Sequence, residues 1–272
     1  MKPFVKDIFY YPVKGLAGIP LDSVDVGPKG LPHDRALGFV FEDSIPPEKN
    51  LNGIENLMWI PKTKMAVQME WPGLAALKIN LDTAGELTLT GPQNKSTKGN
   101  VHRLEDRKKI SGFMSDYLKT LTPAPGAKRT HATPVVLAGQ LHSSTRFPDR
   151  EKEHISFLNL ATLREIEKSF NLSIDIQRFR GNILVEGMEP WSEYTWVGKK
   201  IKVGDCEIEI TAPIVRCFNV NVNPTTGSTD MNLLPLLKPL CDEKIQKNFA
   251  IFGVLGRIAQ PGRVSLKSEL QH

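Results

Sequence analysis

Glycine and proline interrupt this 272-residue chain at short intervals, because it contains 21 glycines and 20 prolines. Both residue types disfavour the interior of helices and strands, so the sequence favours many turns and short elements. Several of the apolar runs between them alternate with polar residues, which is typical of half-buried strands. The sequence therefore predicts a mainly β protein with a few packed helices rather than a helical bundle.

The first third of the chain predicts a small antiparallel barrel or sandwich. Clean alternation of apolar residues at 65–69, at 77–81 and at 87–89 indicates strands, and the turn at 82–85 joins the last two into a hairpin. Further strands are expected at 5–11, 19–26 and 36–42, with a proline- and asparagine-rich loop at 44–56.

Helices are expected at three later places. Apolar residues recur at helical spacing from Ile110 to Leu121, and again from Leu160 to Phe170 after Asn159, which is a suitable helix cap. A short helix broken by prolines is expected at 232–241, and a polar loop at 139–154. Later strands are expected at 182–186, 201–203, 207–210, 250–255 and 263–266. The two prolines of 122–126 predict a boundary between a domain of residues 1–122 and one of residues 123–272.

The charge balance favours an anionic ligand or an acidic protein partner. The formal net charge is +5 and the isoelectric point is about 9.0. The densest basic cluster, at 103–109, has no interleaved aromatic residues, so we expect a solvated helix face there and no nucleic-acid partner.

Three cysteines, Cys206, Cys217 and Cys241, form no C-x-x-C pair. This sparse set predicts neither a disulfide framework nor a zinc site, and it is one thiolate short of an all-cysteine iron–sulfur cluster. The N-terminus has no apolar signal region, and no stretch reaches membrane-spanning length. We therefore expect a cytoplasmic protein without a membrane partner.

Cys217 differs from the other two cysteines because Arg216 precedes it and a strand-like run leads into it. A neighbouring guanidinium lowers the pKa of a thiol and favours the thiolate, which attacks electrophiles or binds soft metals. Taken alone, the pair is also typical of an inert packing cysteine. Four further cations, Lys14, Arg35, Arg178 and Arg180, stand at the ends of other predicted strands, where arginine and lysine are suited to grip a phosphate.

Five motifs follow one another along nearly the whole chain. They are Tyr11-Pro12-Val13-Lys14, Gly30-Leu31 with Asp34-Arg35, Phe179-Arg180 with Asn182, Pro190-Trp191-Ser192-Glu193 with Trp196 and Gly198, and Arg216-Cys217 with Asn223-Pro224 and Thr226-Gly227. In this order they resemble the motifs of MOSC proteins, named after the molybdenum cofactor sulfurase C-terminal domain, with their N-terminal β-barrel domain. Within that family, the resemblance includes the mitochondrial amidoxime-reducing component and its bacterial counterparts.

The resemblance implies a molybdenum–molybdopterin cofactor held between the two domains. It makes Cys217 the metal ligand and, with Arg216 beside it, the catalytic pair. It assigns cofactor binding to Lys14, Arg35, Arg180 and Asn182, and more loosely to Ser156 and Asn159 at the expected start of the central helix, where free N–H groups favour an anion.

Three positions depart from the family's pattern. Gly15 stands where the family usually has serine, Gly181 where it has proline, and Val215 where a small polar residue is common. Gly15 removes a hydroxyl from the phosphate grip but keeps the backbone N–H, and Val215 makes the surroundings of the cysteine more apolar.

The activity that the resemblance implies is reduction of small N-hydroxylated or N-oxygenated compounds. With too few cysteines for an internal cluster, the chain needs a separate electron donor of the ferredoxin or flavoprotein type. A non-catalytic carrier of molybdenum cofactor, or of sulfur as a persulfide on Cys217, is the alternative. A cysteine hydrolase is a third, weaker possibility, because no histidine motif offers a base.

Overall fold

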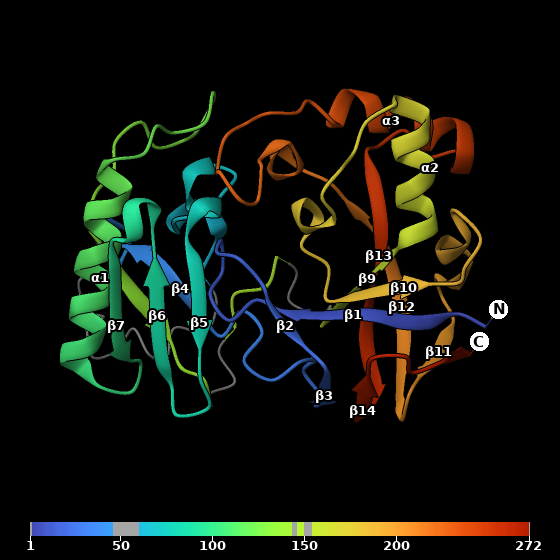
Figure 1. Cartoon of the computed structure of the whole chain (residues 1–272), viewed down its shortest axis with the longest axis horizontal. Helices are drawn as coiled ribbons and strands as arrows, with labels where there is room; N and C mark the ends of the chain where they lie inside the picture. The colour runs from blue at the N-terminus through green and yellow to red at the C-terminus, as the bar shows by residue number, and fades with distance from the viewer. Residues whose placement is uncertain (1, 46–59, 143–145, 150–153, 272) are drawn as a thin grey trace.

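The computed structural model describes residues 2–45, 60–142, 146–149 and 154–271. They form two bodies that lie side by side (Figure 1). One body contains β4 to β8 and α1, and the other contains a large curled sheet with α2 and α3 beside it. Both chain ends lie on the outer side of the second body. No helix in the described part of the chain is both long and apolar enough to cross a membrane.

Short strands dominate the described residues, which confirms the predicted mainly β fold. The elements are β1 Phe4–Tyr10, β2 Ile19–Leu21, β3 Ser23–Val26, β4 Leu37–Phe41, β5 Lys78–Leu81, β6 Glu86–Thr90, β7 Ser96–Asn100, α1 Leu104–Lys119, β8 Val135–Gly139, β9 Ile155–Asn159, α2 Leu160–Phe170, β10 Ile183–Glu186, β11 Lys200–Val203, β12 Cys206–Val215, α3 Leu234–Ile245, β13 Ile251–Gln260, β14 Gly262–Ser265 and β15 Leu270–Gln271.

The large sheet has eight strands in the order β15-β11-β12-β13-β9-β10-β1-β2. Its β9 and β10 are parallel, and its other neighbouring strands are antiparallel. Three smaller groups complete the described strands, namely β14 with β3, β4 with β8, and the meander β5-β6-β7. The predicted hairpin is present, because Leu81 pairs with Leu87 across its turn.

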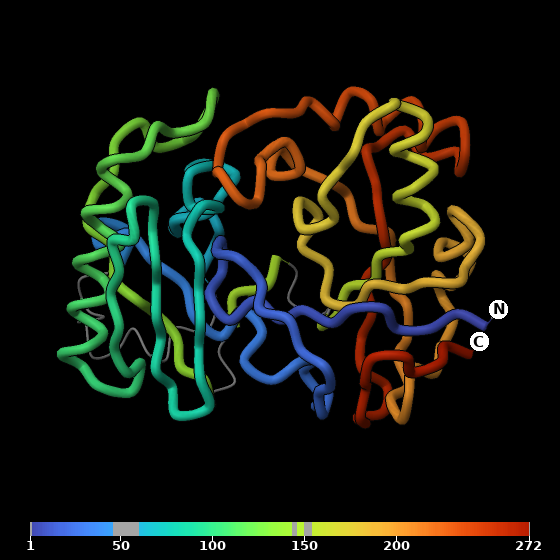
Figure 2. The backbone as a smooth tube through the Cα atoms, viewed as in Figure 1, coloured from blue at the N-terminus to red at the C-terminus, as the bar shows by residue number. Residues whose placement is uncertain are grey.

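Strand pairing joins the two sides of the predicted domain boundary in both directions. β1, from the start of the chain, pairs with β10 in the large sheet, so that Ile8 faces Ile183. In the opposite sense β8, which follows the boundary, pairs with β4, so that Leu37 faces Gly139. The tube in Figure 2 shows the blue N-terminal chain running from the second body into the first. The boundary at 122/123 stays a prediction, and the two bodies are interlocked by pairing.

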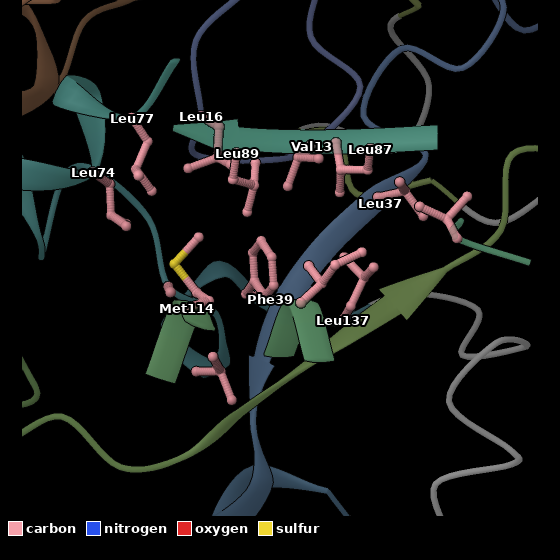
Figure 3. Packing of buried hydrophobic residues seen from close by; sticks show 14 of the residues in the cluster. Val13, Leu16, Leu37, Phe39, Leu74, Leu77, Leu87, Leu89, Met114 and Leu137 are labelled. Atoms are coloured by element: carbon pink, nitrogen blue, oxygen red, sulfur yellow. The ribbon is translucent and has the colours of Figure 1, made fainter. Parts of the chain in front are cut away.

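The first body has its own apolar core, into which α1 packs. Figure 3 shows Phe39 of β4 and Leu137 of β8 on one side of it and Met114 of α1 beside them, and all three are at most 3% exposed. Arg107 of α1 is buried as well and donates hydrogen bonds to the carbonyl oxygens of Val101, Leu137 and Gly139. The predicted helical stripe is thus core, as expected, and it anchors α1 to β8.

Several expectations about local structure were wrong. The alternating residues at 65–69 form no strand, because Gln68 and Met69 already lie in a turn and Met65 makes only an isolated bridge with Val40. The strand expected at 19–26 is split at Asp22, and its halves β2 and β3 pair with different partners. β7, β8 and β9 were not predicted, and α3 continues through Pro239. Residues 46–56 of the expected loop, and part of the one at 139–154, lie outside the described residues.

Candidate functional site

A cavity of ≈ 620 Å³ lies between the two bodies and takes its lining from both. Loops of the first body and the ends of strands in the second meet around it. Eight lysine or arginine side chains and two aspartates line it. The cations outnumber the aspartates by six, which exceeds the net charge of +5 of the whole chain, so the rest of the molecule is close to neutral. The cavity is therefore the place where the protein's field attracts an anion.

Seven of the residues predicted from the sequence line this one cavity: Lys14, Arg35, Ser156, Arg180, Asn182, Arg216 and Cys217. They come from five separate stretches of chain. Their shared position makes a common ligand geometrically feasible, while the role of each in holding a cofactor stays a prediction.

Cys217 follows the end of β12 and caps a short 3₁₀ helix, Phe218–Asn221. Its thiol is exposed and free. The other two cysteines are buried, and their thiols contact the carbonyl oxygens of Gln260 and Ile251, respectively, at 3.2 Å. Burial raises the pKa of Cys206 to about 11 and also raises that of Cys241. Only Cys217 is therefore open to a metal or an electrophile.

Arg216 directs its guanidinium to the protein backbone. Its Nε donates to the carbonyl oxygen of Phe252 at 2.8 Å and its Nη1 to that of Phe179 at 2.8 Å, and Nη2 also reaches Phe252. Burial lowers the pKa of Arg216 to about 10, against the attraction of Tyr194 and Cys217, so the side chain stays cationic at neutral pH. Arg216 thus ties β13 and the segment before β10 to the base of the Cys217 loop.

Lys14 belongs to what we call the Lys14 corner, formed by Lys14, Lys62, Phe147 and Asp149. Lys14 Nζ donates to the carbonyl oxygen of Phe147 and to Asp149 Oδ1, both at 2.7 Å. Burial lowers the pKa of Lys14, and the pairing with Asp149 opposes that effect. Lys62 lines the same cavity and adds a second positive charge at this corner.

Arg35 and Arg180 form what we call the arginine clasp with Tyr11. Both guanidinium groups lie against the Tyr11 ring, at 4.7 Å and 4.5 Å from its centroid, which is cation–π geometry. Arg35 pairs with Asp34 and donates to the carbonyl oxygen of Arg180, while Arg180 donates to that of Leu16. Arg35, from the first part of the chain, therefore binds backbone of the later part, and Arg180, from the later part, binds backbone of the first. Burial lowers the pKa of Arg180 to about 10.

Asn182 and Ser156 form a buried hydrogen-bond network behind the clasp. Asn182 Oδ1 accepts from Ser156 Oγ at 2.8 Å, and Asn182 Nδ2 donates to Asp34 Oδ1 at 3.2 Å. Ser156 lies within β9, so the expectation that it begins the central helix was wrong. The β9 strand was missed because its five residues, Ile155–Asn159, are all buried and show no alternation.

Asn159 does not reach the cavity. It caps α2, as expected, by accepting a hydrogen bond from the backbone N–H of Ala161 at 3.0 Å. Its Nδ2 donates to Glu193 Oε2 at 2.8 Å. The structure thus separates Asn159 from the other seven predicted residues, and places it in a network with Glu193.

Sequence reasoning did not assign four other cations of the lining, Lys29, Lys62, Arg146 and Arg178, nor the carboxylate of Asp149. Lys29, Arg146 and Asp149 lie in turns and loops that carry no motif, and Lys62 begins a short 3₁₀ helix, Lys62–Lys64. Arg178 stands two residues before Arg180 and was recognised only as a strand-end cation. Its side chain is 2% exposed and pairs with Asp230 at 2.8 Å.

The structure gives a physical reason for the glycine at position 15. Its φ is +83°, in the left-handed region, and a Cβ there would lie 2.8 Å from the carbonyl oxygen of Ala66. Serine at this place would therefore be strained and crowded by backbone. The missing hydroxyl reflects close packing of the Lys14 loop against residues 66–67.

A two-bodied β protein with an exposed thiol in the wall of a cation-lined cavity is the class defined by this geometry. The MOSC domain family model matches residues 131–271, and the MOSC N-terminal beta barrel domain model matches residues 2–122. The chain belongs to the MOSC family.

Two curated relatives and one solved structure illustrate the likeness. A molybdenum cofactor sulfurase of Caenorhabditis briggsae is 23% identical over 244 residues, which is 87% of this chain and 31% of the relative. Mitochondrial amidoxime reducing component 2 of Bos taurus is 27% identical over 139 residues, which is 46% of this chain and 41% of the relative. The YUAD protein of Bacillus subtilis has a TM-score of 0.43 and 10% identity, covering 99% of this chain and 94% of its own. The chain spans about a third of the sulfurase's length.

Proposed function

We propose that the protein is a molybdenum-cofactor-dependent oxidoreductase that reduces small N-hydroxylated or N-oxygenated compounds. The observation that carries the proposal is the exposed Cys217 thiol in the wall of a ≈ 620 Å³ cavity with a large excess of cations. Molybdenum cofactor relatives, including one named as an amidoxime reducing component, support this choice over other metal chemistry.

The residues present fit such a cofactor. A thiolate at Cys217 is a soft ligand suited to a redox-active metal, and lysine and arginine side chains complement a phosphate. When bound, the cofactor supplies the oxygen-atom and electron transfer. Cys217 would ligate the metal, and Lys14 with Lys62 would face the anionic end.

The chain's own residues would then position the Cys217 thiol and shape the cavity around it. Arg216 holds the Cys217 loop by its bonds to the carbonyl oxygens of Phe179 and Phe252, so the thiol is presented from a fixed backbone. The arginine clasp holds the two sides of the cavity together. The net reaction, R₂N–OH plus two electrons and two protons giving R₂NH and water, needs two electrons from outside, because three cysteines are too few for an internal all-cysteine iron–sulfur cluster. We propose an acidic ferredoxin or flavoprotein as their source.

Metal and pterin analysis of protein made in a cofactor-competent host tests the proposal. Cys217→Ala should lose bound molybdenum and all reduction of benzamidoxime driven by reduced viologen. Cys206→Ala and Cys241→Ala should keep both, because those thiols are buried away from the cavity. Wild-type turnover by Cys217→Ala would remove the thiolate ligand from the proposal.

The electron source has its own test. Reduced viologen should support turnover by the purified chain, whereas NADH alone should not. Robust NADH-driven reduction by the single chain would contradict the need for a separate donor.

A second function, carriage of molybdenum cofactor or of persulfide sulfur without turnover, is favoured by the exposure of Cys217 and by the relatives named molybdenum cofactor sulfurase. Cyanide-labile sulfur on Cys217 in the absence of molybdenum would support this function. Molybdenum and pterin in equal amounts, with turnover, would favour the reductase.

A further inference from the structure

Lys14 and Asp149 form an ion pair whose two members differ sharply in exposure. The Lys14 side chain is 9% exposed, whereas that of Asp149 is 77% exposed. Two of the three N–H donors of Lys14 go to Phe147 and Asp149, at 2.7 Å each. The bond to Phe147 is to backbone, but the bond to Asp149 is to a side chain that solvent reaches. Asp149 is therefore the partner of Lys14 that a ligand can replace.

The charges around this pair favour an anion at the place of the Asp149 carboxylate. The cavity walls partly desolvate Asp149, which acts to raise its pKa, but the attraction of Lys14, Arg35 and Lys62 outweighs this effect and lowers the pKa to about 2. The carboxylate is thus ionised at every working pH. Its position is therefore one in which three cations stabilise a negative group.

Asp34, the second carboxylate of the lining, behaves differently. It is 4% exposed, and its Oδ1 accepts from the backbone N–H of Tyr11 at 2.7 Å and from Asn182 Nδ2 at 3.2 Å. These bonds fix Asp34 in the fold. Only one of the two cavity aspartates is therefore free to leave its cation.

We propose that Asp149 is an internal competitor that occupies Lys14 until an anionic ligand displaces it, and so determines which anions the cavity accepts. The proposal rests on the proposed function only in that the ligand of this site carries an anionic group such as phosphate. It adds a specificity-determining residue that the function itself does not require.

A ligand binds to Lys14 only if its affinity exceeds that of the Asp149 carboxylate already bound there. A tethered carboxylate is present at high effective concentration, so every incoming anion must first replace it. A simple monoanion such as nitrate exchanges one single charge for another and gains little. A phosphate brings close to two negative charges and three strong acceptor oxygens, so it can engage Lys14 and Lys62 together. The competitor lowers the affinity of all anions, and only multiply charged ligands remain bound at cellular concentrations.

Calorimetric titration with inorganic phosphate and with nitrate tests this, using the full chain from a host that makes no pterin cofactor. Asp149→Asn removes the competing charge and should bind phosphate about tenfold more tightly, the equivalent of one charge-assisted hydrogen bond. Nitrate binding should be undetectable in the wild type and measurable in Asp149→Asn. Asp149→Glu keeps the charge and should bind as the wild type does. Asp149→Ala repeats the charge removal in case the asparagine variant folds poorly.

Asp116→Asn is the matched control, because Asp116 is 79% exposed and pairs with Lys119 outside the cavity at 2.9 Å. It changes the net charge by the same amount and should leave phosphate affinity unchanged. If Asp149→Asn binds phosphate no better than the wild type, or more weakly, Asp149 positions Lys14 and the competition is refuted. An equal gain in Asp116→Asn would also refute it, because the effect would then be one of net charge.

The two proposals fail separately. If protein made in a cofactor-competent host contains neither molybdenum nor pterin, the proposed function is refuted, and the phosphate titrations remain a valid test of the competition. Molybdenum in the wild type together with unchanged phosphate affinity in Asp149→Asn would end the competition alone.

Discussion

The Lys14 corner and the arginine clasp lie in the same cavity, carry the same sign of charge and do different things with it. Both guanidinium groups of the clasp bind backbone carbonyl oxygens and the face of Tyr11, and Arg35 also pairs with the buried carboxylate of Asp34. The ammonium of Lys14 binds one carbonyl oxygen and the solvent-exposed carboxylate of Asp149. A cation's position in a cavity therefore does not reveal its role, whereas the identity of its present acceptors does.

Side-chain chemistry explains the difference. A planar guanidinium offers five donors in a rigid fork and is weakly hydrated, so it can cross-link carbonyl groups from two chain segments and stack on a ring. An ammonium is a compact point charge whose partner is exchanged more easily. We infer that the clasp mainly stabilises the junction of the two bodies, and that the corner mainly serves a ligand.

The largest expected effect comes from Arg180→Met. It removes the bond to the Leu16 carbonyl and the contact with Tyr11, and we expect the free energy of unfolding in urea to fall by about 3 kcal/mol. Lys14→Met should lower it by only about 1 kcal/mol, because its carboxylate partner is exposed. Equal losses in the two variants would break the comparison.

Glu193 extends the comparison of charged groups to one without a counter-charge. Among the described residues, its carboxylate forms no ion pair. It is 1% exposed, and burial raises its pKa from 4.5 to about 7, against the hydrogen bonds from Asn159 and Thr162. The folded protein thus holds a proton that the unfolded chain has released, so this stability is complete below about pH 4.5 and is lost as the pH rises through about 7.

Glu193→Gln should abolish that dependence. Between pH 5 and pH 8 the wild type should lose about 2 kcal/mol of unfolding free energy relative to the variant, measured by urea denaturation at both values. Parallel pH profiles of the two proteins would show that Glu193 is ionised throughout.

Lys14→Met should lower phosphate affinity about tenfold, which is the usual value of one charge-assisted hydrogen bond. Lys98→Met, which removes an exposed lysine paired with Glu86 outside the cavity, is the control and should leave the affinity unchanged. Calorimetry gives both values. A larger loss of affinity in Arg180→Met than in Lys14→Met, in variants that remain folded, would assign the anion to the clasp.

Tyr11→Phe has the smallest expected effect. It keeps the ring against which both guanidinium groups lie and removes only the hydroxyl, which donates to the Gly181 carbonyl at 3.2 Å. We expect a loss of about 1 kcal/mol in unfolding free energy. A loss as large as that of Arg180→Met would show that the hydroxyl, and not the stacking, holds the clasp.

Part of this molecule could be predicted from its sequence because the signals were local. The apolar stripe of α1, the Asn159 cap and the hairpin of β5 and β6 each depend on residues within one element. The family motifs also identified seven residues that line one cavity. A motif can indicate that residues belong to the same site even when their individual contacts are unknown. The function of each motif residue was harder to predict, because Arg35, Arg180 and Arg216 find their acceptors in distant backbone.

The remaining features depend on tertiary packing. β8 and β9 are buried along their whole length and show no alternation, so nothing distinguishes them from other apolar runs. Residues 65–69 show alternation without forming a strand, because the chain already turns at Gln68 and Met69. Asp149 carries no motif, and its importance follows only from the position of Lys14, 135 residues earlier in the chain.

The pairing of β1 with β10 has a consequence for synthesis on the ribosome. Phe4 faces Glu186, so this edge of β1 stays open until its partner is made about 180 residues later. At roughly 5–20 residues per second, the delay is on the order of 10–35 s. The other edge of β1 pairs with β2, which follows it directly along the chain, so that Ile8 faces Leu21. A two-stranded ribbon with one open edge is marginally stable and prone to aggregation, so the large sheet can close only after β10 has been made.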